Sequence, residues 1–172
     1  MRNAVFAGQF YPAGADELRA QLNSFFKGST QGNDAIAIVS PHAGYVYSGR
    51  VAACAFSALK EAGTYIILSP NHTGIGGDVS IYPAGEWETP LGKVEVDAEI
   101  AERIARGMGC ECDEVAHAGE HSIEVQIPFL QFMHAKRGGK GGFKIVAITI
   151  ADTRLETLKK LGKLLHNEIK KG

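Results

Sequence analysis

The chain has 172 residues, of which 45% are hydrophobic and 22% are charged. This length fits one domain with a sizeable apolar core, so we expect a single domain over residues 1–172. The formal net charge of −1 does not indicate the strongly basic surface with which proteins neutralise nucleic-acid phosphates, and the lysines near the C-terminus are read as a solvated helix face, so no nucleic-acid partner is expected.

The sequence also argues against membrane insertion, secretion and disulfide bonding. It has no apolar run of about 18 residues, and its N-terminus lacks the apolar core of a signal peptide. Its three cysteines are an odd number and include no CxxC pair. We therefore expect a cytoplasmic protein with reduced thiols and no membrane partner.

The first part of the chain predicts a helix followed by a strand, helix, strand unit. Apolar side chains recur at i, i+4 and i+7 within residues 15–26, which places them on one helical face. They are Leu18, Leu22 and Phe25. Residues 35–39 and 65–68 are apolar runs without alternation, typical of strands buried on both faces. Residues 48–62 predict a closely packed helix between them, so a parallel crossover would bring the carboxyl ends of both strands to one edge.

Two further strands and a capped helix are predicted next. Residues 79–82 and 92–96 flank a turn-rich stretch and could form an antiparallel extension, whose pairing the sequence leaves open. Asp97 is a suitable N-cap for a helix that runs to about Arg106, where Gly107 would end it.

The last part of the chain predicts a helix, a strand and a helix. Residues 120–134 have helical periodicity, and we expect Pro128 to kink that helix. Residues 145–150 predict a third buried strand, and a capping box from Thr153 to Glu156 would start the final helix. Strands that alternate with helices predict an α/β fold with a mainly parallel central sheet.

Two histidines follow similar turns after the first two predicted strands. The segments read Val39-Ser-Pro-His42 and Leu68-Ser-Pro-Asn-His72. Ligands of open α/β sheets bind beyond the carboxyl ends of the strands, so both imidazoles could face one crevice. Imidazole binds iron, zinc and copper and exchanges protons near neutral pH. We favour metal binding or acid–base chemistry over the alternative that each histidine only bonds the local backbone.

A second group of titratable side chains lies between His117 and Glu124. Glu120 and Glu124 would share a helical face, and His121 and Glu124 are neighbours at i, i+3. They could form an acid–base pair, or Ser122 and Glu120 could merely cap the helix while His121 bonds to local groups. Near His42, Tyr45 and Tyr47 could line a pocket that accepts an aromatic group or could pack against the next helix.

Four segments resemble the Memo family, known in microbes as AmmeMemoRadiSam system protein B and related to the LigB-type extradiol dioxygenases. They are Ala7-Gly-Gln-Phe-Tyr-Pro12, Pro41-His-Ala-Gly-Tyr-Val-Tyr-Ser-Gly49, Leu68-Ser-Pro-Asn-His72 and Glu120-His-Ser-Ile-Glu-Val-Gln-Ile-Pro-Phe-Leu130. They occur in order between residues 7 and 130 of the chain. The resemblance implies a three-layer α/β/α fold of the LigB type.

The resemblance also implies a non-haem metal centre with His42 and His72 as ligands. The metal would be iron, with copper and zinc as alternatives. Some relatives carry a second histidine where Thr73 stands, so the resemblance does not fix which residue of that loop is the ligand. Members of the family continue past the last predicted helix into a further strand, a histidine and a cysteine-bearing segment. We therefore expect a C-terminally truncated or reduced relative in which Glu120, His121 or a partner chain must supply a further ligand.

Two functions from different classes follow. The first is a dioxygenase-like iron enzyme in which His42 and His72 hold the metal, His121 or Glu120 handles protons, and Tyr45 and Tyr47 contact substrate. The second is a non-catalytic module that binds a peptide or small molecule at the same pocket. The family resemblance also implies a functional link to a radical-SAM protein.

Overall fold

The computed structural model describes residues 1–28, 32, 34–139 and 141–170. The chain divides into two compact units, each assembled from three separated segments. Unit 1 comprises Met1–Gly63, Trp87–Val94 and His121–Phe143, and unit 2 comprises Thr64–Glu86, Glu95–Glu120 and Lys144–Gly172. The expectation of one domain over residues 1–172 stays a prediction.

The sheet is centred on β5 (Lys144–Ile150), whose side chains from Ile145 to Thr149 are all buried. It pairs in parallel with β1 (Thr64–Pro70) from Thr64↔Lys144 to Pro70↔Ile150. On its other side, β4 (Gly92–Val96) pairs in parallel with the start of β5, and β2 (Val79–Ile81) pairs antiparallel with its end. The expected α/β fold with a mainly parallel sheet is therefore confirmed.

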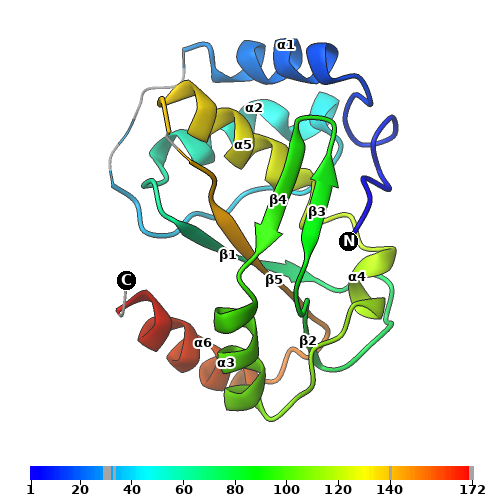
Figure 1. Ribbon diagram of the computed structural model, residues 1–172, viewed down its shortest axis with the longest axis vertical. Helices are drawn as coiled ribbons and strands as arrows, with labels where there is room; N and C mark the ends of the chain where they lie inside the picture. The colour runs from blue at the N-terminus through cyan, green and yellow to red at the C-terminus, as the bar shows by residue number, and fades with distance from the viewer. Residues whose placement is uncertain (29–31, 33, 140, 171–172) are drawn as a thin grey trace. The chain divides into compact units, whose positions relative to one another are not determined.

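The path of the sheet is β1-β5-β4-β3, where β3 spans Glu86–Thr89. In unit 2, α3 (Ala98–Met108) and α6 (Leu155–Ile169) lie side by side (Figure 1). Their apolar side chains and those of β2 and β5 form one core cluster. Its buried members are Val79, Ile81, Ala101, Ile104, Ala105, Val146, Ile148 and Leu161. Unit 2 also contains the short helix α4 (Val115–Ala118).

Unit 1 is mainly helical, with α1 (Ala15–Phe26), α2 (Tyr45–Ala58) and α5 (Ile127–Lys136) gathered together (Figure 1). Leu18 and Leu22 of α1 are fully buried, as their helical spacing predicts. Aromatic rings join the other two helices, since Phe129 of α5 stacks on Phe56 of α2 with ring centroids 5.3 Å apart. None of the described helices is both long and apolar enough to cross a membrane.

The predicted strand at residues 35–39 is wrong. In the described chain this run forms only an isolated bridge between Ala35 and Leu59, and Ile36 and Val39 are exposed. A strand requires a lateral partner for its backbone N–H and C=O groups, and the local pattern cannot specify that partner. The parallel crossover expected between residues 35–39 and 65–68 is therefore not formed.

The helix predicted over residues 48–62 is α2, which starts earlier, at Tyr45, and ends earlier, at Ala58. Three further helix ends differ from expectation. The predicted helix over residues 120–134 starts instead with a 3₁₀ turn, η1 (Glu124–Gln126), and continues as α5. Pro128 lies in the first turn of α5, where its missing N–H leaves no helical bond unmade, so the expected kink is wrong. Asp97 caps α3 as predicted, but the left-handed residue that ends α3 is Gly109 rather than Gly107.

The third difference lies at the start of α6. Thr153 does not cap this helix, whose N-cap is Arg154 without a side-chain cap bond. Asp152 acts instead, because its carboxylate accepts from the backbone N–H of Arg154 at 2.8 Å and from the hydroxyl of Thr157. These bonds lower the pKa of Asp152, chiefly the one from Thr157.

Candidate metal centre

His72 lies just beyond the carboxyl end of β1, as the sequence predicts. Its side chain is half-exposed, whereas Glu120, its partner within unit 2, is buried. The backbone N–H of His72 donates to Glu120 Oε2 at 2.7 Å, and the Nδ1 atom of His72 lies 3.1 Å from Glu120 Oε1. One buried carboxylate therefore fixes both the backbone and the ring of this histidine.

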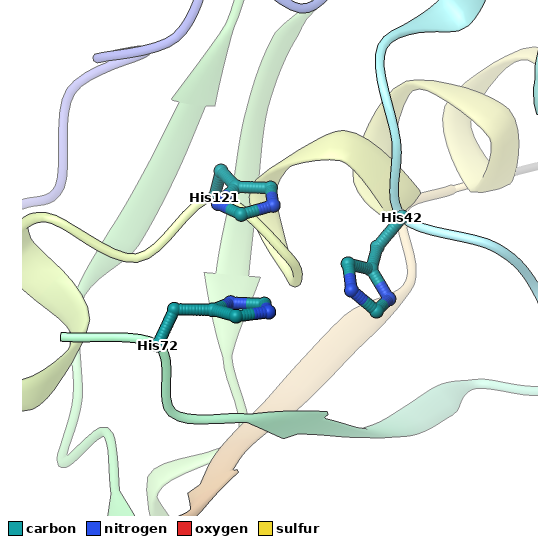
Figure 2. Close-up of side chains that lie close together, drawn as sticks. All are labelled: His42, His72 and His121. Atoms are coloured by element: carbon teal, nitrogen blue, oxygen red, sulfur yellow. The ribbon is translucent and has the colours of Figure 1, made fainter. Parts of the chain in front are cut away.

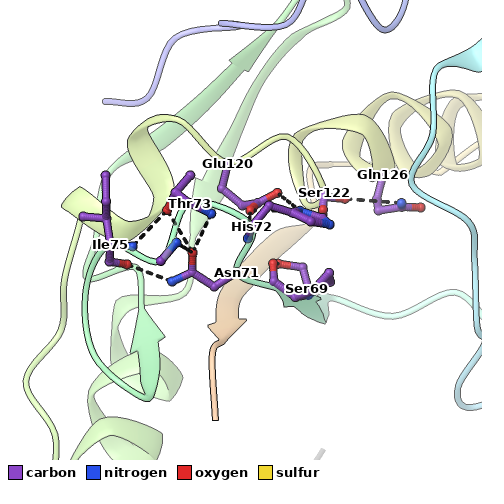
Figure 3. Close-up of polar contacts among 10 residues, drawn as sticks. Ser69, Asn71, His72, Thr73, Ile75, Glu120, Ser122 and Gln126 are labelled. Carbon is purple, nitrogen blue, oxygen red and sulfur yellow. Dashed lines mark hydrogen bonds and ion pairs between the residues drawn. The ribbon is translucent and has the colours of Figure 1, made fainter. Parts of the chain in front are cut away.

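The loop that carries His72 is held by Asn71 (Figure 3). Its side-chain oxygen accepts from the backbone N–H groups of Thr73 and Gly74 and from the Thr73 hydroxyl, and its amide donates to Ile75 O at 2.8 Å. Such turns restrict the backbone without help from a sheet or helix. The loop is thus ordered on both sides of the His72 imidazole.

The bond to Glu120 also selects a tautomer of His72. A carboxylate accepts hydrogen bonds, so Nδ1 must carry the proton when it donates to Glu120. The lone pair of a neutral ring then resides on Nε2, which is the form that binds a metal ion. Histidine ligands in metal sites commonly donate their other N–H to a carboxylate in this way.

His42 and His121 come together within unit 1. Their ring centroids are 5.8 Å apart, and each offers a ring nitrogen within 4.8 Å of the other's. Figure 2 shows these two imidazoles turned toward a common space, and it also draws His72 of unit 2. Within unit 1 the histidine beside His42 is thus His121, and the expected convergence of His42 with His72 stays a prediction.

Gln126 of η1 links the two histidine segments of unit 1. Its side-chain nitrogen donates to Pro41 O at 3.1 Å and to Ser122 O at 3.3 Å. Pro41 directly precedes His42, and Ser122 directly follows His121. Sequence analysis gave Gln126 no role, because the Pro41 contact spans 85 residues and no local pattern predicts it.

Two aromatic side chains flank the His121 ring. Phe10 lies with its centroid 4.4 Å from that of His121, and Phe6 makes an edge contact at 5.6 Å. Both phenylalanines are partly exposed. The motif containing Phe10 was part of the family resemblance, but neither ring was predicted to contact His121.

Glu124 is buried and bonds to the amino-terminal segment of the chain. The expectation that it shares a helical face with Glu120 is wrong, because Glu120 lies before the 3₁₀ turn and outside any helix. Its carboxylate forms an ion pair with Arg2 and accepts from the backbone N–H of Phe6 and the hydroxyl of Tyr11. Burial, and secondly the bond to Glu124, raises the pKa of Tyr11. These contacts fasten the amino-terminal segment to the turn that follows His121.

The two tyrosines near His42 occupy different environments. Tyr45 is buried, and its hydroxyl donates to Val125 O at 2.7 Å. Burial raises the pKa of this hydroxyl well above its usual value. Tyr47 is exposed on α2. Tyr45 thus has the packing role that the sequence left open, and substrate contact by either residue stays a prediction.

Comparison with known proteins assigns the chain to a family. Residues 2–172 match the family model described as Memo-like protein. The chain belongs to the Memo-like family. A MEMO1 family protein of Pyrococcus furiosus is 45% identical over 173 residues, which cover 96% of this chain and 58% of that relative. Similar proteins of Methanosarcina barkeri and Methanopyrus kandleri are 43% and 40% identical.

The Memo-like resemblance stated from the sequence is therefore confirmed. The match covers 63% of the Methanosarcina barkeri protein and 61% of the Methanopyrus kandleri protein. This chain thus spans about three fifths of the length of these Memo-like relatives. Their printed names state family membership and name no reaction.

Proposed function

We propose that this Memo-like protein binds a single non-haem metal ion, iron in the first instance, through His42, His72 and His121. The observation that carries the proposal is the contact between His72 Nδ1 and Glu120, which leaves Nε2 of His72 as the metal-binding atom. Copper and zinc are the alternative ions, because imidazole also suits both.

The contacts within each unit support a common site. In unit 1, His42 and His121 each present a ring nitrogen to the other. In unit 2, the ring of His72 is bonded to Glu120. Glu120 directly precedes His121 in the chain. The residue that bonds to His72 is therefore adjacent in sequence to another of the proposed ligands.

The donor set fits a reactive metal ion. Three neutral imidazoles leave coordination positions for water or substrate, as catalytic sites with three protein ligands do. When bound, the metal would supply Lewis-acid or redox chemistry at these open positions. Glu120 holds a proton on His72 Nδ1 and is a positioning residue, whereas sequence analysis had assigned it to proton transfer. The aromatic rings of Phe6 and Phe10 would limit the access of water to the metal ion on the side of His121.

Metal analysis after anaerobic reconstitution with Fe(II) tests the proposal. We expect close to one iron per chain in the unaltered protein and a loss of most of it in each of His42→Ala, His72→Ala and His121→Ala. His166→Ala is the matched control, because this histidine lies exposed on α6. Parallel loading with Cu(II) and Zn(II) identifies the preferred ion.

Iron-free protein after reconstitution would refute the metal centre and would favour the second candidate, a module that binds a peptide or small molecule. Equal iron in the His72 variant and the control would remove His72 from the ligand set. Oxygen uptake with catechol-like compounds then tests whether the loaded protein is a dioxygenase-like enzyme. A cytoplasmic location and a functional link to a radical-SAM protein are further parts of this proposal.

A further inference from the structure

Unit 2 contains two cysteines that the proposed histidine centre does not use. Cys110 and Cys112 follow α3 and flank Glu111. Both cysteines are free and partly buried, whereas Glu111 is exposed. Burial that alternates in this way places the side chains at i and i+2 on one side of the chain. Both cysteines also pack against the same apolar cluster, the one formed by α3, α6, β2 and β5. The two thiols therefore share one side of the segment.

The backbone of this segment is fixed at both ends. At its start, the N–H of Cys110 donates to Ala105 O at 3.1 Å, directly after the left-handed residue Gly109 that ends α3. At its end, the N–H of Asp113 donates to Ile81 O of β2 at 2.9 Å. The separation of the two cysteines is therefore set by the fold of unit 2.

The i, i+2 spacing suits a bridging ion better than a disulfide. Alternate residues of an extended chain have Cα atoms about 6.6 Å apart. That separation is close to the upper limit of about 6.8 Å for a disulfide, whose Cβ atoms must also approach to about 3.5–4.5 Å. A metal ion between two sulfur atoms holds them farther apart, at about 4.6 Å when each metal–sulfur bond is about 2.3 Å. An ion thus joins Cys110 to Cys112 with less movement of the backbone.

The charges around the pair also favour a bound cation of low charge. Burial, and secondly Cys110, raises the pKa of the Cys112 thiol, so the two thiols interact electrostatically. Burial also raises the pKa of the Cys110 thiol, whereas the nearby ammonium of Lys160 opposes this rise. Lys160 is held in place because it donates to Met108 O at 2.7 Å. Two thiolates with one monovalent ion carry a net charge of −1, which Lys160 can compensate.

We propose that Cys110 and Cys112 bind one soft, two-coordinate metal ion, Cu(I), at a second site that lies within unit 2. Thiolates are the soft ligands that select this ion. Binding forms two S–Cu bonds and releases the two thiol protons to water, while copper stays in the +1 state. The site is separate from the histidine centre and does not depend on it.

Anaerobic titration with Cu(I), in competition with a chelator of known affinity, tests this proposal on the reduced chain. We expect one Cu(I) bound at the pair, and a fall in the number of thiols that react with a thiol reagent from three to one, the exposed Cys54. Cys110→Ser and Cys112→Ser should each weaken this binding about 100-fold or more, because a two-coordinate ion loses one of its thiolates. Cys54→Ser is the matched control and should bind like the unaltered chain.

Because copper is also an alternative ion for the histidine centre, the titration is repeated with His42→Ala, which should keep the copper at the cysteine pair. Copper that His42→Ala loses and Cys110→Ser retains would overturn the second site and leave the histidine centre standing. Three reactive thiols in the presence of Cu(I) would overturn it too. Circular dichroism checks the fold of each variant, and Cys110→Ala, which keeps the position apolar, replaces the serine variant if that one unfolds.

Discussion

Glu120 forms two bonds to one residue, which sets it apart from the acidic side chains on the surface. It is buried, accepts from the backbone and faces the ring of His72. A carboxylate occupied in this way is suited to orient the ring more than to exchange protons with a substrate. The residue directly after it is His121, so a disturbance of Glu120 would affect two of the proposed ligands.

We predict that Glu120→Gln weakens iron binding by about 10–100-fold, the usual effect of removing a carboxylate behind a histidine ligand. The amide retains the shape of the side chain but can present an N–H to Nδ1, which favours the wrong tautomer. A competitive titration against a chelator of known affinity measures the change. Glu95→Gln, at an exposed side chain, is the control, and equal affinities for the two variants would contradict the role given to Glu120.

Tyr11 makes the free energy of unfolding depend on pH in alkali. Burial raises its pKa in the folded protein, whereas an unfolded tyrosine ionises near pH 10. The contribution of Tyr11 is therefore complete below about pH 10 and is lost as the pH rises above that value, since only the unfolded chain readily releases the proton. We expect Tyr11→Phe to reduce the fall in stability above pH 10.

Urea unfolding between pH 8 and pH 11 measures this dependence. Tyr11→Phe should also be less stable at pH 8, by about 1–3 kcal/mol, because Glu124 loses a buried hydrogen bond. Tyr47→Phe, at an exposed ring, should leave the curve unchanged. An unaltered alkaline slope in Tyr11→Phe would contradict the prediction.

At the scale of elements, the loop after β1 depends on a glycine. Gly76 has φ +96°, a conformation that other residues rarely adopt. A Cβ atom there would lie 2.7 Å from Ala116 Cβ and at the same distance from Asp113 Oδ2 and Ser80 Oγ. Those atoms belong to α4, the segment before it and β2, so the loop passes too close to them for any side chain.

We predict that Gly76→Ala destabilises the fold by about 1–3 kcal/mol, as overpacking does, and lowers iron binding through displacement of the His72 loop. Chemical denaturation and metal analysis of the same variant measure both effects. Gly63→Ala is the control, because an added Cβ meets nothing there and its φ is not positive. Wild-type stability in Gly76→Ala would show that the loop can shift without cost.

Local sequence patterns correctly predicted the helices and strands that are marked by their own apolar spacing or capping residue. The spacing of Leu18 and Leu22 predicted α1, the apolar runs predicted β1 and β5, and Asp97 predicted the start of α3. The pattern at residues 35–39 failed because a strand also needs a partner. The kink expected at Pro128 was wrong because a 3₁₀ turn precedes α5, so this proline lies in the first turn of the helix and not in its interior.

The candidate site was predicted only in part for a related reason. His72 could be placed because it follows a strand directly. Its bond to Glu120 joins residues 48 positions apart, and the bond from Gln126 to Pro41 joins residues 85 apart. Such pairs form through the fold of the whole chain, so no periodicity or capping rule indicates them.

For the whole molecule, binding of iron should appear as an increase in stability. A ligand that binds only the folded state at 100 times its dissociation constant raises the free energy of unfolding by about 2.7 kcal/mol. For a chain of this size that corresponds to a rise in Tm of roughly 5–11 °C. Calorimetry with and without Fe(II) measures it. The rise should vanish in His42→Ala and persist in His166→Ala, and an equal rise in both would place the ion elsewhere.

The ion pair between Arg2 and Glu124 also sets an order of events during synthesis. Arg2 precedes Glu124 by 122 residues, so it leaves the ribosome long before its partner exists. At about 5–20 residues per second, the delay is roughly 6–24 s. Throughout that interval the guanidinium of Arg2 must remain in water or in temporary contacts. Docking of the amino-terminal segment, and with it the contact of Phe6 and Phe10 with His121, therefore belongs to the late stages of folding on the nascent chain.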